Sequence, residues 1–145
     1  HPNHLIIAAD QTLMHPQYGF MGKPLTASRA KEQLMACSGK KLTFYTGLCL
    51  FNSNNGTSNN QLALAKVCYH HFSAERADAY IQKEQPFYCA GSIKVDALGA
   101  CLIRSIESND PNTILGLPLL ILNTMLQEQN YDLLTNQPMN FQHSE

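Results

Sequence analysis

Charged residues are scarce in this sequence. Lys and Arg (10) together with Asp and Glu (11) make up only 14% of its 145 residues, and the formal net charge is −1. Ordinary proteins carry roughly 25% charged residues. A protein that grips nucleic acid through its phosphates needs a clustered excess of Lys and Arg, and a basic helix at a membrane surface needs the same. We therefore expect neither nucleic acid nor a membrane among the partners of this protein.

Long apolar runs are also missing. The longest run, residues 114–122, has nine residues even when its Gly and Pro are counted, whereas a helix that spans a bilayer needs about 20. The first ten residues, HPNHLIIAAD, lack the basic segment and the small-residue cleavage site of a secretory signal peptide. We therefore expect a soluble protein.

The five cysteines do not form a recognisable framework. Their number is odd, they are widely spaced, and none belongs to a C-x-x-C pair, so neither a disulfide scaffold nor a zinc cluster is expected. A reducing cytoplasm is the simplest location. Cys49, Cys68 and Cys101 have apolar neighbours, which predicts that they are small core residues.

The chain starts with an apolar run that ends in a carboxylate. Residues 5–10, LIIAAD, predict a buried strand with Asp10 at its C-terminal tip. Residues 11–24 contain two Gly and two Pro, so they predict an irregular connection with room for a short hairpin. In open α/β sheets, ligands bind at the carboxyl ends of the strands. Asp10 is therefore either a functional residue or the cap of a turn.

The rest of the chain alternates strand and helix patterns. Residues 42–51 and 62–72 predict two strands joined by a hairpin turn at Asn55-Gly56. The segments with helical periodicity are 27–37, capped by Thr26 and stopped by Gly39; 74–83, capped by Ser73; and about 118–127, whose core side would carry Leu119, Leu122, Met125 and Leu126. This alternation predicts an α/β fold with a mixed central sheet flanked by helices, because the hairpin forces at least one antiparallel pair.

The length suits a single domain. We place its boundary near residue 129, so that the domain covers 1–129 and residues 130–145, which lose the periodicity, form a loosely ordered tail. Residues 87–103 predict a turn-rich segment in which Gly91 and Gly99 bracket two short strand-like pieces.

Five separated motifs occur in one order along the chain. They are AADQ (8–11), GKP (22–24), SGKKLTFYTGLCLF (38–51), YIQKEQPFYCAGSIK (80–94) and DPNTILGLPLLIL (110–122). Together they resemble the Maf-like nucleoside triphosphate pyrophosphatases, with a Maf/ITPase-like fold, and more narrowly their 7-methyl-GTP branch. The resemblance covers residues 4–129 and is specific because chance does not readily supply several motifs in order.

The resemblance implies hydrolysis of a nucleoside triphosphate to the monophosphate and pyrophosphate, assisted by Mg²⁺ or Mn²⁺. It implies that Asp10 is the catalytic residue, either as the proton acceptor for water or as a metal ligand, directly or through water. Lys23 would compensate phosphate charge, and Gln11 and Asp96 would set base specificity. The branch typically has Glu-Gly where this chain has Asp96 followed by Ala97. The expected base is 7-methylguanine, a pyrimidine (dTTP or UTP) stays the alternative, and Asp96 alternatively caps a turn.

The family's first segment has no counterpart in this sequence. Family members begin with a strand and a Ser-rich, Arg-containing loop that cradles the triphosphate, whereas here His1 stands just ahead of the AADQ strand. The resemblance thus implies a member without its N-terminal strand and phosphate loop. A second hypothesis follows, in which the chain is a catalytically impaired remnant that acts as a binding or structural protein, with a homodimer as one form.

Overall fold

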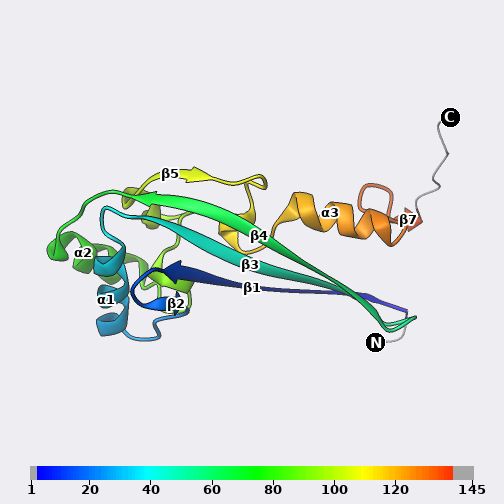
Figure 1. Cartoon of the computed structure of the whole chain (residues 1–145), viewed down its shortest axis with the longest axis horizontal. Helices are drawn as coiled ribbons and strands as arrows, with labels where there is room; N and C mark the ends of the chain where they lie inside the picture. The colour runs from blue at the N-terminus through cyan, green and yellow to red at the C-terminus, as the bar shows by residue number, and fades with distance from the viewer. Residues whose placement is uncertain (1–2, 139–145) are drawn as a thin grey trace.

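The computed structural model describes residues 3–138, which form a five-stranded sheet and three α-helices, with a further short hairpin (Figure 1). The strands of the large sheet are β1 (Leu5–His15), β2 (Gly19–Met21), β3 (Lys41–Asn52), β4 (Thr57–Tyr69) and β5 (Ile103–Glu107). The helices are α1 (Ala27–Cys37), α2 (Ala74–Glu84) and α3 (Leu119–Glu128). The predicted α/β class, a central sheet flanked by helices, is confirmed. Within 3–138, no helix is both long and apolar enough to cross a membrane.

The strand order is β2-β1-β3-β4-β5, and every strand pair among the described residues is antiparallel. The parallel pairs of a mixed sheet are therefore not found in this part of the chain. Hairpins join β1 to β2 and β3 to β4, and tight turns of this kind make antiparallel pairs. The crossover through α1 starts from β2, which already runs opposite to β1, so β3 arrives beside β1 in the antiparallel direction.

Strand β1 is longer and more exposed than the sequence predicts. It continues through Asp10 to His15, and Asp10 pairs with Gly47 in the middle of the ladder rather than at a strand tip. Residues 6–10 are exposed. In the described residues, β2 joins β1 only from Leu13 onward, so at Asp10 strand β1 is an edge. The Pro and Gly after His15 mark the turn of the β1–β2 hairpin. They do not mean that the first strand ends at Asp10.

The capped helices match their predictions closely. The hydroxyl of Thr26 accepts from the Arg29 N–H at 3.2 Å, and the hydroxyl of Ser73 accepts from the Arg76 N–H, also at 3.2 Å. Gly39 follows α1 with φ 71°, and a β-carbon there would overlap the ring of His71. Only glycine meets both demands without strain. These local signals fixed the helix boundaries because each satisfies backbone groups within its own few residues.

Helix α3 forms where predicted, but its core side differs by one residue. Leu122, Met125 and Leu126 are buried, whereas Leu119 is 46% exposed. Leu119 is the first residue of the helix, and it is not part of the cluster that packs α3 on Leu48 and Leu50 of β3.

Two apolar clusters lie on the same face of the sheet. The first packs α1 and α2 against the beginning of β3 and the end of β4, and includes Leu34, Phe44 and Val67. The second packs α3 against Leu48 and Leu50 of β3. Figure 1 shows α1 and α2 at one end of the sheet and α3 toward the other. Because side chains alternate along a strand, Thr46 lies on this helix-covered face between Phe44 and Leu48.

Residues 87–103 are turn-rich as predicted, but Gly91 and Gly99 lie within 3-10 turns, Ala90–Ser92 and Leu98–Cys101, and residues 93–97 between these turns form a loop rather than a strand. Strand β5 follows them and was not predicted. Its sequence, IRSIE, lacks the period-two alternation of a half-buried strand because β5 is an exposed edge.

Residues 131–132 and 137–138 form the short hairpin β6–β7, made of Tyr131–Asp132 and Gln137–Pro138. The predicted loose tail begins in this hairpin, and its remaining residues, 139–145, lie outside the described part of the chain. The prediction for the tail and for the domain boundary at residue 129 stays a prediction.

The cysteine that enters the core is Cys37 of α1. It is fully buried, while Cys49 and Cys68 are half-buried and Cys101 is exposed. The expectation of a core residue is therefore wrong for Cys101. Among residues 3–138, no group of three His, Cys, Asp or Glu side chains is placed to hold a metal ion.

Alkaline pH should destabilise the fold. Burial raises the pKa of the Cys37 thiol from 9.0 to about 12, and burial also raises the pKa values of Tyr69 and Tyr80 above 10. These groups keep their protons longer in the folded chain, so their contribution is complete below pH 9 and is lost as the pH rises from there toward 12. The Cys37 thiol lowers the free energy of unfolding by about 1.4 kcal/mol per pH unit above pH 9, and the two tyrosines add to this decline only above pH 10.

Urea unfolding followed by circular dichroism between pH 8 and pH 11 measures this slope. Cys37→Ala, which lacks the thiol, should show a shallower decline than the unmodified chain above pH 9. Equal slopes for the two proteins would contradict the assignment.

Candidate active site

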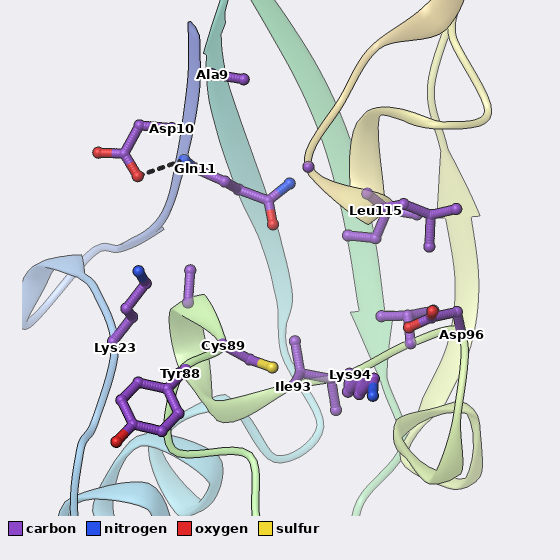
Figure 2. Close-up of a pocket in the computed structure, with 14 residues that line it drawn as sticks. Ala9, Asp10, Gln11, Lys23, Tyr88, Cys89, Ile93, Lys94, Asp96 and Leu115 are labelled. Carbon is purple, nitrogen blue, oxygen red and sulfur yellow. Dashed lines mark hydrogen bonds between the residues drawn. The ribbon is translucent and has the colours of Figure 1, made fainter.

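A cavity of about 330 Å³ opens beside β1, between the two apolar clusters. Its lining residues come from four separate parts of the chain: Ala9, Asp10 and Gln11 of β1; Lys23; Tyr88, Cys89, Ala90, Ile93, Lys94, Val95 and Asp96; and Ile114, Leu115 and Gly116. All four residues predicted for the site, Asp10, Gln11, Lys23 and Asp96, line this one cavity, as Figure 2 shows.

Asp10 and Gln11 point in different directions because they are neighbours on a strand. Figure 2 shows the Asp10 carboxylate on one side of β1 and the Gln11 amide on the other, toward the loop of Leu115. Asp10 is exposed, and its Oδ1 accepts from the Gln11 N–H at 3.0 Å. This bond orients the carboxylate at the rim, while its Oδ2 has no hydrogen-bond partner within 3–138.

Lys23 stands on the segment between β2 and α1. The carbonyl of Gly22 before it accepts from Gln33 Nε2 and from the Gly91 N–H, both at 3.2 Å. The segment is thus fastened at its base, and the exposed lysine extends from it. In Figure 2 the Lys23 ammonium points to the same side of the cavity as the Asp10 carboxylate.

The ion pairs of the described residues do not involve the charged side chains at this end of the cavity. They are Lys31–Asp78, Lys41–Glu107 and Lys94–Glu84, so in this part of the chain neither Lys23 nor Asp10 nor Asp96 belongs to an ion pair. A lysine without a protein counter-ion is a suitable partner for phosphate.

Asp96 lies in a tight turn at the opposite end of the cavity. The turn is closed by the N–H groups of Ala97 and Gly99, which donate to the carbonyl of Lys94 at 3.2 and 3.0 Å. The turn closes through backbone groups, and the Asp96 carboxylate caps nothing among the residues that the structure describes. Figure 2 shows it pointing into the cavity below Leu115.

Apolar side chains surround the end of the cavity near Asp96. Ile93 is buried and Leu115 is 53% exposed, and they reach the cavity from two different loops (Figure 2). The cavity therefore has a charged end, with Asp10 and Lys23, and an end lined by apolar side chains where Gln11, Lys94 and Asp96 supply the polar groups. A nucleotide has the same division between its phosphates and its base.

Several lining residues were not assigned a role from the sequence. Lys94 lies in a matched motif, which was the available signal, and its Nζ is 3.8 Å from Glu84 Oε1. Cys89 places a thiol in the cavity, but burial raises its pKa above 9.0, so a thiolate nucleophile is not expected at neutral pH. Tyr88 is 76% exposed beside Lys23 (Figure 2).

The carboxylates that line the cavity suit a cation that binds together with the phosphates of a ligand. Within 3–138 no three-residue metal cluster exists, so a dedicated protein cage is not built here. Mg²⁺ commonly keeps several waters and binds through one or two carboxylates together with substrate phosphates. The exposed carboxylate of Asp10, with Oδ2 unbonded in the described residues, fits that mode.

Comparison with known proteins places the chain in a family. The sequence profile of the family described as "Maf-like protein" matches residues 1–129. A protein from Aliivibrio fischeri (strain ATCC 700601 / ES114), called "7-methyl-GTP pyrophosphatase", is 41% identical over 133 residues, which cover 92% of this chain and 68% of the relative. The family match includes every residue that lines the cavity.

Proposed function

This chain belongs to the Maf-like protein family, and from that premise we propose that it is a nucleoside triphosphate pyrophosphatase. The reaction adds water across the bond between the α and β phosphates, so that a nucleoside monophosphate and pyrophosphate are released. The observation that carries the proposal is the division of the cavity into a charged end and an apolar end with polar edges. The relative named 7-methyl-GTP pyrophosphatase supports the same assignment.

Asp10 is the residue we assign to the chemical step. Its carboxylate accepts the proton of the attacking water while the new P–O bond forms and the bridging P–O bond breaks. A positioned general base of this kind typically contributes about 10²–10⁴-fold. The bond from the Gln11 N–H to Oδ1 leaves Oδ2 for the water or for a cation.

A divalent cation, Mg²⁺ or Mn²⁺, is part of the proposal. Asp10 would hold it together with the phosphates of the substrate, and when bound it would offset the negative charge of the triphosphate. Lys23 lies at the same end of the cavity and binds a phosphate group through its ammonium.

The base would lie at the apolar end. We propose 7-methylguanine as the preferred base, because its N7-methyl group leaves a positive charge that the Asp96 carboxylate balances, and because its donors suit a carboxylate acceptor. Pyrophosphate release from 7-methyl-GTP, GTP, dTTP and UTP, measured with and without a chelator, tests substrate class, base and cation together. Preference for dTTP or UTP would move the base assignment to the pyrimidine alternative, and no release from any nucleotide would contradict the function.

Removing the lysine charge should weaken catalysis moderately. Lys23→Gln should lower kcat/KM about tenfold, because a charge-assisted contact to phosphate is worth about 1.5 kcal/mol or more. Steady-state kinetics measures this loss, and Lys66→Gln is the matched control, since Lys66 is an exposed lysine of β4 outside the cavity. Equal kinetics for the two variants would show that Lys23 does not contact the substrate.

A further inference from the structure

The amide of Gln11 is held from one side by two oxygen atoms. Its Nε2 donates to the carbonyl of Thr113 at 2.8 Å and to Oγ1 of Thr46 at 2.9 Å. A backbone carbonyl can only accept. The nitrogen end of the Gln11 amide must therefore face Thr113, and chemistry fixes the orientation of the amide.

The hydroxyl of Thr46 completes this arrangement. Thr46 and Thr113 are both fully buried, and Thr46 Oγ1 lies 3.4 Å from the Thr113 carbonyl, to which it donates. The hydroxyl uses its proton on Thr113 and its lone pair on Gln11. Both hydrogens of the Gln11 amide thus have acceptors, and neither is left for a ligand.

The oxygen of the Gln11 amide is the end that faces the cavity. Gln11 Oε1 has no hydrogen-bond partner in the described residues, and Figure 2 shows it pointing into the cavity toward the side of Ile93 and Asp96. An ionised carboxylate also only accepts. Gln11 and Asp96 therefore present two side-chain acceptors at the base end, where Lys94, whose Nζ lies 3.8 Å from Glu84 Oε1, also lines the cavity.

We propose that Thr46 is a specificity-determining positioning residue, which holds Gln11 as an acceptor so that the cavity selects a base with donors on its edge. The inference rests on the proposed function and names what the site reads. Guanine carries two adjacent donors, N1–H and the 2-amino group. Uracil and thymine place carbonyl oxygens on both sides of a single N–H, so a carbonyl would face a fixed acceptor.

Losing the hydroxyl should release the amide. In Thr46→Val one Nε2 hydrogen loses its buried acceptor, and an unsatisfied buried donor is unfavourable. A partial rotation of the amide keeps one N–H on the Thr113 carbonyl and turns the freed N–H toward the cavity, where water or a base carbonyl satisfies it. The preference for guanine over uracil should then decline, because Gln11 can now donate to a uracil carbonyl as well as accept from a guanine N–H.

Binding of monophosphates tests this without requiring turnover. Isothermal calorimetry with 7-methyl-GMP, 7-methyl-IMP, which lacks the 2-amino group, and UMP gives the affinity ratios. For Thr46→Val we expect the ratio of 7-methyl-GMP to UMP affinity to fall about tenfold, the equivalent of one hydrogen bond of about 1.4 kcal/mol. The ratio of 7-methyl-GMP to 7-methyl-IMP affinity should fall with it.

Two further variants separate selectivity from folding. Thr46→Ser keeps the hydroxyl and should retain the original ratios, even if its stability falls. Thr43→Val is the matched control on the same strand, because Thr43 lies on the other face of β3 and should change no ratio.

The inference is overturned if Thr46→Val weakens all three ligands equally, or if Thr46→Ser loses selectivity as Thr46→Val does. Pyrophosphate release by the unmodified chain is measured separately. A chain that turns over nucleotide but whose base selectivity ignores Thr46 would overturn this inference alone. A chain with Thr46-dependent selectivity and no turnover would support the inference and contradict only the proposed reaction.

Discussion

Asp10→Asn should lower kcat/KM for pyrophosphate release by about 10²–10⁴-fold, the contribution of a positioned general base. The substitution keeps the shape of the side chain, and the Asn oxygen can still accept from the Gln11 N–H. It removes the negative charge and the capacity to take a proton from water. Because Asp10 is exposed on β1, the free energy of unfolding should stay nearly unchanged.

Steady-state kinetics at saturating Mg²⁺ measures this effect, and urea unfolding confirms that the variant is folded. Glu107→Gln, an exposed carboxylate on β5 of the same sheet, is the control and should keep full activity. An Asp10→Asn variant that retains a tenth of the original kcat/KM would show that Asp10 is not the base.

Asp110→Asn should lower the free energy of unfolding by about 2–4 kcal/mol, through the loss of buried charge-assisted hydrogen bonds. Asp110 is 1% exposed. Its Oδ2 accepts from the N–H groups of Leu120 at 2.7 Å and Ile121 at 3.1 Å, and its Oδ1 accepts from the Asn112 N–H at 3.1 Å. In Asn, one of these oxygens becomes an NH₂ group that faces donors.

The position of these bonds explains the size of the effect. Leu120 and Ile121 belong to the first turn of α3, whose N-cap residue, Pro118, has no side-chain oxygen to offer. Asp110 caps the helix from eight residues upstream of that N-cap, and its negative charge suits the positive end of the helix dipole. The same segment brings Leu115 to the cavity and the Thr113 carbonyl to Gln11, so Asp110 couples α3 to the base end of the site.

Urea unfolding of Asp110→Asn and of Asp78→Asn forms the matched pair. Asp78 is exposed and pairs with Lys31 at 2.8 Å on the surface, so its substitution should change the free energy of unfolding by less than about 1 kcal/mol. Equal losses in the two variants would contradict the capping role.

The sequence by itself determined the local features. Thr26, Ser73 and Asn55-Gly56 placed two helices and a hairpin because capping and turn formation involve backbone groups only a few residues away. The ordered motifs determined the family and gathered Asp10, Gln11, Lys23 and Asp96 as site residues. They did so through similarity of sequence, which does not depend on knowing how far apart these residues lie in the fold.

The tertiary structure decided what depends on distant partners. The predicted end of β1 at Asp10 was wrong, because pairing with β3 and β2 extends the strand to His15. The roles of Thr46 and Asp110 were not visible, because their partners lie 67 and 10 residues further along the chain. A threonine in a strand looks like any β-branched residue until the fold brings a carbonyl to its hydroxyl. The sequence alone thus predicted four side chains that line the cavity, and the packing of the loop at 110–116 onto β3 decided how one of them, Gln11, is presented.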